Sequence, residues 1–184
     1  ENIPPTGSFV VVANHVSDLD PPAIAAALRL SQLRRVYWGA TVQRLFTRRW
    51  LDPFWRASHV MPVDERLPSS TFALPLAVLK RGNGLVWFPE GWRSPDGRLQ
   101  RFQPGIGKLI AETGAPVVPA FISGAFEALP RDRRLPRLAH IHIRFGRPIE
   151  ASTLKETGTG GSDVERIADA LHRAVAALGP AAAK

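Results

Sequence analysis

The chain has 184 residues, a net charge of +8 and no cysteine. This length is enough for one domain with a substantial core, and the lack of cysteine excludes disulfides, thiolate metal sites and cysteine nucleophiles. No apolar run approaches the roughly 18 residues that predict a transmembrane helix. The positive charge is explained either by solubility alone or by an anionic partner, such as a phosphate-bearing substrate, an anionic membrane surface or nucleic acid.

Strands and helices are expected to alternate from the start of the chain. Ser8 to Ala13 is a continuous β-branched run and predicts a buried strand. Pro22 to Leu30 is alanine-rich with proline in its first turn, which predicts a helix, and Arg35 to Ala40 predicts a second strand. Thr41 to Trp55 mixes aromatic side chains with arginines. This mixture favours a groove wall or a membrane-facing surface, or alternatively a core helix with solvated arginines.

The same alternation continues through the middle of the chain. Ser58 to Val63 is a short strand, and Ser69 to Lys80 is a helix with a serine cap. Leu85 to Phe88 is a buried strand, Gly105 to Thr113 a helix stopped by a glycine, and Pro116 to Ile122 a further strand.

Pro130 to Pro136 is a basic loop, and the alternating segment Ala139 to Phe145 predicts a strand. After a flexible break, Ser162 begins a capping box that opens a last helix within 161–184. Strands alternating with helices predict an α/β fold: one domain over 1–184, with a largely parallel central sheet and helices on both faces.

A histidine and an aspartate lie where the first strand passes into the first helix. His15 can take a proton from a hydroxyl, and a carboxylate on its other ring nitrogen would orient it. Asp20 lies five residues on, within reach across a turn, and Asp18 is a rival partner. No G-x-S-x-G elbow supplies a serine nucleophile. The hydroxyl of Ser17, two residues from His15, is better explained as a group that stabilises the turn than as a nucleophile. The pair is therefore either structural or a base that acts on a hydroxyl carried by the substrate.

A second polar segment, Phe88 to Ser94, also follows a buried strand. If the strands are parallel, it opens at the same edge of the sheet as His15. It offers the carboxylate of Glu90, a glycine that permits close backbone approach, and Arg93, which suits a phosphate. The alternative is a polar turn held by a Glu–Arg pair.

Other candidate sites are weaker. His140 and His142 share one face of a strand but lack a third ligand, so no metal site is expected. The arginine clusters match no recognised nucleic-acid-binding module, and no nucleic acid partner is expected.

Three motifs taken together are more specific than each alone. Asn14-His15-x4-Asp20, then Phe88-Pro89-Glu90-Gly91-x-Arg93-Ser94, then Val118-Pro119 resembles, in order and spacing, the glycerolipid acyltransferase family, which includes 1-acylglycerol-3-phosphate acyltransferase. The resemblance extends from about Glu1 to Ile149. It implies a glycerol-3-phosphate acyltransferase-like α/β fold.

The resemblance also implies roles for individual residues. His15 would be the general base and Asp20 its orienting partner. The second motif would bind the acceptor through Glu90, Gly91, Arg93 and Ser94, and the glycerol phosphate would lie near Glu90, Gly91 and Arg93. The segment Val118-Pro119 would lie on the acyl-donor side.

The implied partners are an acyl thioester on coenzyme A or acyl carrier protein, a lysophospholipid acceptor and an anionic membrane surface. No metal, cofactor or covalent intermediate would be needed. The expected location is cytoplasmic, peripheral on the inner face of the membrane. The chain opens on Glu1 without a methionine, so we expect it to be part of a longer protein whose N-terminal membrane-anchoring helices it lacks.

The sequence departs from the family pattern at two positions. Trp92 stands where the second motif usually has threonine, which favours an acceptor other than lysophosphatidate, such as a lyso-aminolipid or a specialised metabolite. Arg66 lies one residue late for the arginine that follows a strand in the family, and it is a candidate phosphate ligand. A non-catalytic module that binds anionic lipid surfaces through the Arg44 to Arg56 stretch is the remaining alternative.

Overall fold

The computed structural model describes residues 2–41, 52–63, 72–133 and 135–180. Within these ranges the chain forms a six-stranded sheet in the order β3-β2-β4-β1-β5-β6. All neighbouring strands are parallel except β5 and β6. The expected single α/β domain with a largely parallel sheet is confirmed, and the antiparallel edge strand is the exception to its parallel order.

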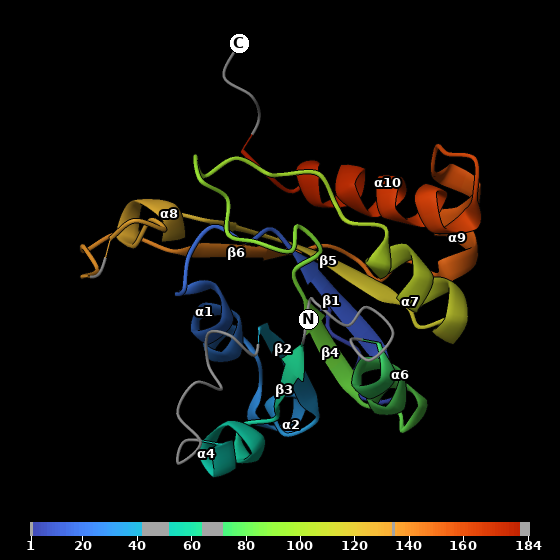
Figure 1. Cartoon of the computed structure of the whole chain (residues 1–184), viewed down its shortest axis with the longest axis horizontal. Helices are drawn as coiled ribbons and strands as arrows, with labels where there is room; N and C mark the ends of the chain where they lie inside the picture. Colours follow the sequence, from blue (N-terminus) through green and yellow to red (C-terminus); the bar gives the residue numbers. More distant parts are fainter. Residues whose placement is uncertain (1, 42–51, 64–71, 134, 181–184) are drawn as a thin grey trace.

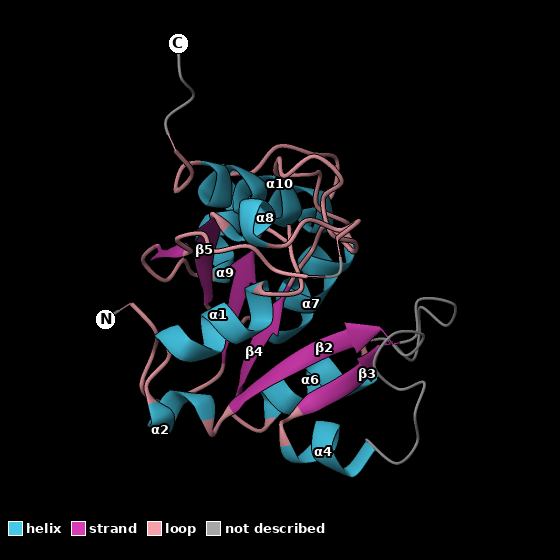
Figure 2. Ribbon diagram, turned by 90° about the vertical axis from the view of Figure 1, so that its left-hand side faces the viewer, coloured by secondary structure: helices cyan, strands magenta, loops and turns pink. Residues whose placement is uncertain are grey.

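The strands and helices have the following bounds. The strands are β1 Phe9–Ala13, β2 Val36–Thr41, β3 Val60–Val63, β4 Gly84–Trp87, β5 Val117–Ser123 and β6 His142–Phe145. The helices are α1 Asp20–Ala27, α2 Leu30–Leu33, α4 Asp52–Ala57, α6 Ala73–Lys80, α7 Gly105–Thr113, α8 Ala125–Ala128, α9 Ala151–Thr157 and α10 Asp163–Ala176. Figure 1 shows their arrangement, and Figure 2 shows β2 and β3 side by side with α4 beyond them.

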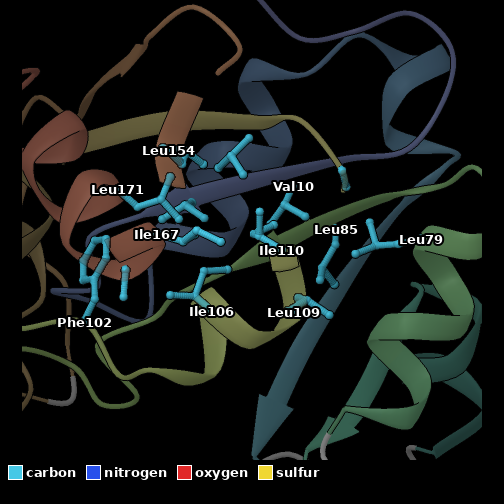
Figure 3. Packing of buried hydrophobic residues seen from close by; sticks show 14 of the residues in the cluster. Val10, Leu79, Leu85, Phe102, Ile106, Leu109, Ile110, Leu154, Ile167 and Leu171 are labelled. Carbon is cyan, nitrogen blue, oxygen red and sulfur yellow. The ribbon is translucent and has the colours of Figure 1, made fainter. Parts of the chain in front are cut away.

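The central strand β1 is buried on both faces, which explains its uninterrupted apolar sequence. Val10 and Val12 face a core cluster built with α6, α7, α9 and α10. Phe9, Val11 and Ala13 face a second cluster that includes Ile24 of α1. Helices therefore cover both faces of the sheet, as expected. Figure 3 shows the first cluster.

The amphipathic helix α10 packs on this first cluster through residues spaced by one helical turn. Ile167, Leu171 and Val175 are all fully buried. Its neighbour α7 comes unusually close, because a Cβ at Gly107 would lie 2.0 Å from the carbonyl oxygen of Val164. Gly107 is thus required for helix packing.

Several elements differ from the sequence-based expectation. The first helix ends at Ala27 because Leu28 is extended, and α2 follows separately. The helix expected from Ser69 with a serine cap instead begins at Ala73, and its N-cap residue is Phe72, which makes no side-chain capping bond. Both candidate serines lie outside the described residues. Two short helices, α8 and α9, were not predicted: α8 has only four residues, and α9 buries only Leu154. Such short segments carry little hydrophobic periodicity.

The strand order gives the sheet a topological switch point between β1 and β4. The connection that leaves β1 runs through α1 on one face of the sheet, whereas the connection that leaves β4 runs through α7 on the other. Because β1 and β4 are parallel neighbours, the chain diverges at their carboxyl ends. Such a switch point is where open α/β sheets bind ligands.

Candidate active site

Asn14 anchors the loop that follows β1. Its side-chain amide donates to the carbonyl oxygen of Ile122 at 2.9 Å, and its side-chain oxygen accepts from the N–H of Ile122 at 2.7 Å. The side chain is 1% exposed, so both bonds are made in the interior. These bonds tie the residue before His15 to β5 and restrict where His15 can lie. Asn14 belongs to the first motif, but no role for its side chain was predicted from the sequence.

His15 and Asp20 meet directly. The His15 Nδ1 atom lies 2.8 Å from Asp20 Oδ2. The same carboxylate oxygen accepts from the backbone N–H groups of Val16, at 2.7 Å, and Ser17, at 2.8 Å. Asp20 is the first residue of α1 and is fully buried, so its carboxylate is held by the turn that it closes. The pairing leaves Nε2 as the ring nitrogen able to exchange a proton with a substrate.

The imidazole is also held from its face. It stacks on Phe88, with ring centroids 4.3 Å apart and planes at 23°. Asp18, the rival partner, instead lies 2.9 Å from the Arg93 guanidinium. Asp20 therefore pairs with His15, and Asp18 pairs with Arg93 on the loop after β4.

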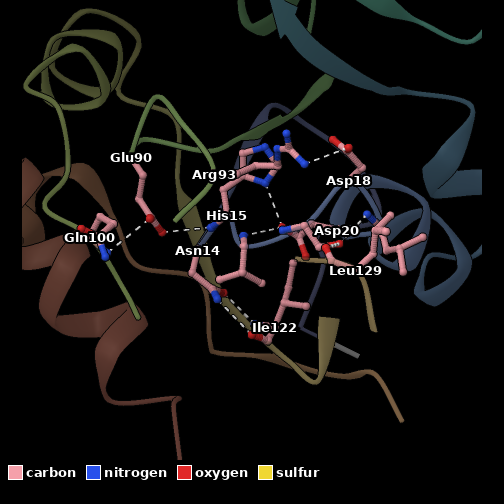
Figure 4. Close-up of polar contacts among 12 residues, drawn as sticks. Asn14, His15, Asp18, Asp20, Glu90, Arg93, Gln100, Ile122 and Leu129 are labelled. Atoms are coloured by element: carbon pink, nitrogen blue, oxygen red, sulfur yellow. Dashed lines mark hydrogen bonds and ion pairs between the residues drawn. The ribbon is translucent and has the colours of Figure 1, made fainter. Parts of the chain in front are cut away.

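Glu90 joins that loop to the loop of His15. One carboxylate oxygen accepts from the His15 backbone N–H at 2.9 Å, and the other accepts from the Gln100 N–H at 3.2 Å. In return, the Ser94 N–H donates to the His15 carbonyl oxygen at 2.7 Å. Figure 4 shows His15 between Glu90 and Gln100 on one side and Arg93 and Asp18 on the other. Both main-chain polar groups of His15 are thus bound by the second motif.

Burial raises the pKa of Glu90 to about 7, although its two backbone hydrogen bonds oppose the shift. The native state therefore binds more protons at Glu90 than the unfolded chain does between pH 4.5 and about 7. Over that range Glu90 lowers the free energy of unfolding as pH rises, by about 3 kcal/mol at most.

We expect Glu90→Gln to remove this pH dependence. An amide keeps the shape of the side chain but cannot ionise, and its NH₂ group faces one backbone N–H. The measurement is urea unfolding, followed by circular dichroism, at a series of pH values across the range. Glu156→Gln, which alters an exposed glutamate of α9, is the matched control. Equal slopes for the wild type and Glu90→Gln would contradict the assignment.

A pocket of about 510 Å³ opens beside this network. It is lined by Glu90, Trp92, Arg93, Pro95, Gln100, Arg101, Gln103 and Arg131. Its cationic side chains come from three places in the sequence, and the basic loop after α8 contributes Arg131. The Arg131 guanidinium carbon lies 5.8 Å from the centre of the Trp92 ring, within range of a cation–π contact. The lining suits an anionic group next to a flat apolar one.

The other residues of the second motif have different surroundings. Gly91 has a φ of +83°, which glycine adopts without strain, and it is exposed. Ser94 is fully buried, and its hydroxyl donates to Asp96 at 2.9 Å. Gln100 donates to the Ser94 hydroxyl at 3.2 Å. Ser94 therefore braces the loop from inside and does not face the pocket.

Comparison with known proteins assigns the family. A family model described as Acyltransferase matches residues 1–123. The chain belongs to the acyltransferase family. A crystal structure of the 1-acyl-sn-glycerophosphate (LPA) acyltransferase PlsC from Thermotoga maritima is similar, with a TM-score of 0.76 and 25% sequence identity. That similarity covers 100% of this chain and 71% of the other.

Two curated plant proteins are also similar to this acyltransferase. The 1-acyl-sn-glycerol-3-phosphate acyltransferase BAT2, chloroplastic, of Brassica napus is 30% identical over 131 residues, which is 71% of this chain and 37% of that protein. The 1-acyl-sn-glycerol-3-phosphate acyltransferase LPAT1, chloroplastic, of Arabidopsis thaliana is 30% identical over 154 residues, which is 83% of this chain and 42% of that protein. The matched region thus spans less than half of either relative.

Val118 and Pro119, which the family resemblance placed on the acyl-donor side, do not line this pocket. Val118 and Pro119 of the acyltransferase are buried in β5, where they pair with β1 at Val11 and Val12. Neither presents its side chain to solvent, so their position supports β1, which ends at Ala13, just before Asn14. Arg66 lies outside the described residues, as does most of the arginine-rich stretch from Arg44 to Arg56.

Two absences concern only the part of the acyltransferase that the structure describes. In those ranges, no three His, Cys, Asp or Glu side chains gather in a way that could hold a metal ion. Nor does any helix there have the length and apolar character needed to cross a bilayer.

Proposed function

We propose that this acyltransferase moves a fatty acyl group from an acyl thioester, on coenzyme A or acyl carrier protein, to a hydroxyl of a lysophospholipid such as 1-acylglycerol-3-phosphate. The observation that carries the proposal is the His15–Asp20 pair, with its 2.8 Å contact, beside a pocket rich in arginine. The plant relatives and PlsC are named for transfer to 1-acyl-sn-glycerol-3-phosphate or lysophosphatidate, which supports the same acceptor.

In the proposed reaction His15 is the general base. Its Nε2 takes the proton of the acceptor hydroxyl as the oxygen attacks the thioester carbonyl. The C–S bond then breaks, the ester forms, and the imidazolium returns the proton to the departing thiolate. Asp20 fixes the imidazole orientation and stabilises the positive charge that develops on the ring. Proton transfer by a positioned base of this kind contributes about 10²–10⁴-fold to the rate.

The acceptor would be held by the pocket rather than by the reacting residues. Arg93 and Arg131 line it, and a guanidinium can bind a phosphate through two parallel N–H donors. Arg93 also pairs with Asp18 on the loop of His15. An anionic headgroup bound there would bring its neighbouring hydroxyl toward the histidine.

The test is a thiol-release assay in detergent with a panel of acceptors, run once with an acyl-coenzyme A and once with an acylated acyl carrier protein as donor. We expect release that depends on the acceptor, with lysophosphatidate among the best. Acceptor-independent hydrolysis, or no release with any acceptor from either coenzyme A or acyl carrier protein, would contradict the proposal.

A second candidate keeps the chemistry and changes the acceptor. Trp92 is 59% exposed at the edge of the pocket and lies beside Arg131. An indole at this position favours an acceptor with an apolar or cationic group next to its phosphate, such as a lyso-aminolipid. In the same panel, a clear preference for such an acceptor over lysophosphatidate would favour this candidate.

The proposed location is peripheral, on the inner face of a membrane, where a lipid acceptor would be presented.

A further inference from the structure

The segment after α8 exposes large apolar side chains to solvent. Leu135 is 76% exposed and Leu138 is 106% exposed, so neither packs against the protein. We name residues 130–133 and 135–140 the docking loop. Figure 1 shows this segment extending beyond α8 at the left end of the molecule. Exposing two leucines this close together to water is unfavourable in free energy unless a partner covers them.

The same loop is basic. Arg131, Arg133 and Arg137 are exposed, with Asp132 as the acidic residue among them. Leucines interleaved with arginines match the boundary of an anionic bilayer, where apolar side chains enter the acyl region and guanidinium groups remain at the headgroups. The leucines protrude, which suits insertion into a fluid layer.

The loop is fixed to the candidate active site at its start. Ser17, two residues after His15 and fully buried, donates its hydroxyl to the carbonyl oxygen of Leu129 at 2.8 Å. The Arg137 N–H donates to the carbonyl oxygen of Ala128 at 2.7 Å, which closes the loop at its base. Arg131 reaches the pocket and lies beside the exposed ring of Trp92. A surface that touches the leucines would therefore also lie near the pocket entrance.

We propose that the docking loop, together with Trp92, is the surface through which this protein binds an anionic lipid bilayer. The inference rests on the proposed function, because it presents the pocket to the layer that would hold the lysophospholipid. Tryptophan is favoured at the membrane–water interface, and arginine near an anionic surface contributes about 1 kcal/mol each. Binding should weaken as the salt concentration rises.

The first measurement is sedimentation with vesicles of phosphatidylcholine alone or mixed with phosphatidylglycerol. We expect the wild type to bind the mixed vesicles preferentially. Leu135→Ser/Leu138→Ser should weaken binding at least about tenfold, and Arg133→Gln/Arg137→Gln about thirtyfold. Folding of each variant is checked by circular dichroism.

Matched controls lie elsewhere on the surface. Leu30→Ser removes a leucine of α2 that is 64% exposed, and Lys80→Gln/Arg81→Gln removes two exposed charges at the end of α6. These controls should bind as the wild type does. The inference would be overturned if the wild type did not bind anionic vesicles. It would also be overturned if the docking-loop variants bound these vesicles as well as the controls do.

A second measurement separates this inference from the proposed function. Thiol release is followed with the acceptor dispersed in detergent and with the acceptor embedded in mixed vesicles. We expect the leucine variant to keep its detergent rate and to lose at least about tenfold with vesicles. Equal rates with vesicles would overturn the membrane role. Absence of thiol release from the wild type in detergent would instead contradict the proposed chemistry, and the sedimentation result would then still decide whether the docking loop binds lipid.

Discussion

Replacing His15 with alanine is expected to abolish acyl transfer, with a loss of about 10⁴-fold. The fold should survive, because the main-chain contacts of this position remain when the imidazole loses its contacts with Asp20 and Phe88. The N–H donates to Glu90 and the carbonyl oxygen accepts from Ser94, and alanine keeps both groups. Thiol release measures the first expectation, and far- and near-ultraviolet circular dichroism measures the second.

The matched control changes a histidine outside the site. His142→Ala alters an exposed residue of β6 and should leave thiol release unchanged. If His15→Ala retained a rate close to that of the wild type, the general-base assignment would be wrong.

Replacing Asp20 with asparagine is expected to slow transfer by about 10²-fold or more, and by no more than His15→Ala does, because Asp20 acts through His15. An asparagine oxygen can still accept the bonds that Asp20 Oδ2 receives from Val16 and Ser17. It carries no negative charge to stabilise the imidazolium. Asp20 Oδ1 has no hydrogen-bond partner among the described residues, so an NH₂ group there would be unpaired and would cost some stability.

A double variant distinguishes positioning from structural damage. If Asp20 acts only through His15, adding Asp20→Asn to His15→Ala should not slow the residual rate further. A multiplicative loss in the double variant would mean that Asp20 supports the site in another way. Thiol release with one acceptor and urea unfolding of all four proteins provide the full comparison.

The candidate site was predictable where its contacts are local. His15 and Asp20 are five residues apart across one turn, so the spacing alone indicated that they could meet, and the structure brings them to 2.8 Å. The motif from Phe88 to Ser94 was expected at the same edge of the sheet, and the parallel pairing of β1 with β4 puts it there. Their catalytic and binding roles remain predictions.

Other contacts in the site could not be predicted from the spacing of residues in the sequence. Glu90 was expected near the phosphate and lines the pocket, but the sequence did not indicate that its two oxygens accept from the backbone of His15 and Gln100. Ser94 was expected in the acceptor site and is fully buried within its own loop. A carboxylate can bind a ligand, a cation or a backbone N–H, and composition alone does not choose among them.

By itself, the sequence determined the alternation of strands and helices, the buried central strand and the neighbourhood of His15 and Asp20. These features follow from hydrophobic periodicity and from groups close in the chain. Only the tertiary structure decided that Asp18 pairs with Arg93, that Asn14 binds Ile122 and that Arg131 lies over Trp92. Each of these contacts joins segments far apart in the sequence: the loops after β1 and β4, the loop after β1 and the end of β5, and the loop after β4 and the segment after α8. Strand order, rather than local sequence, brings these segments together.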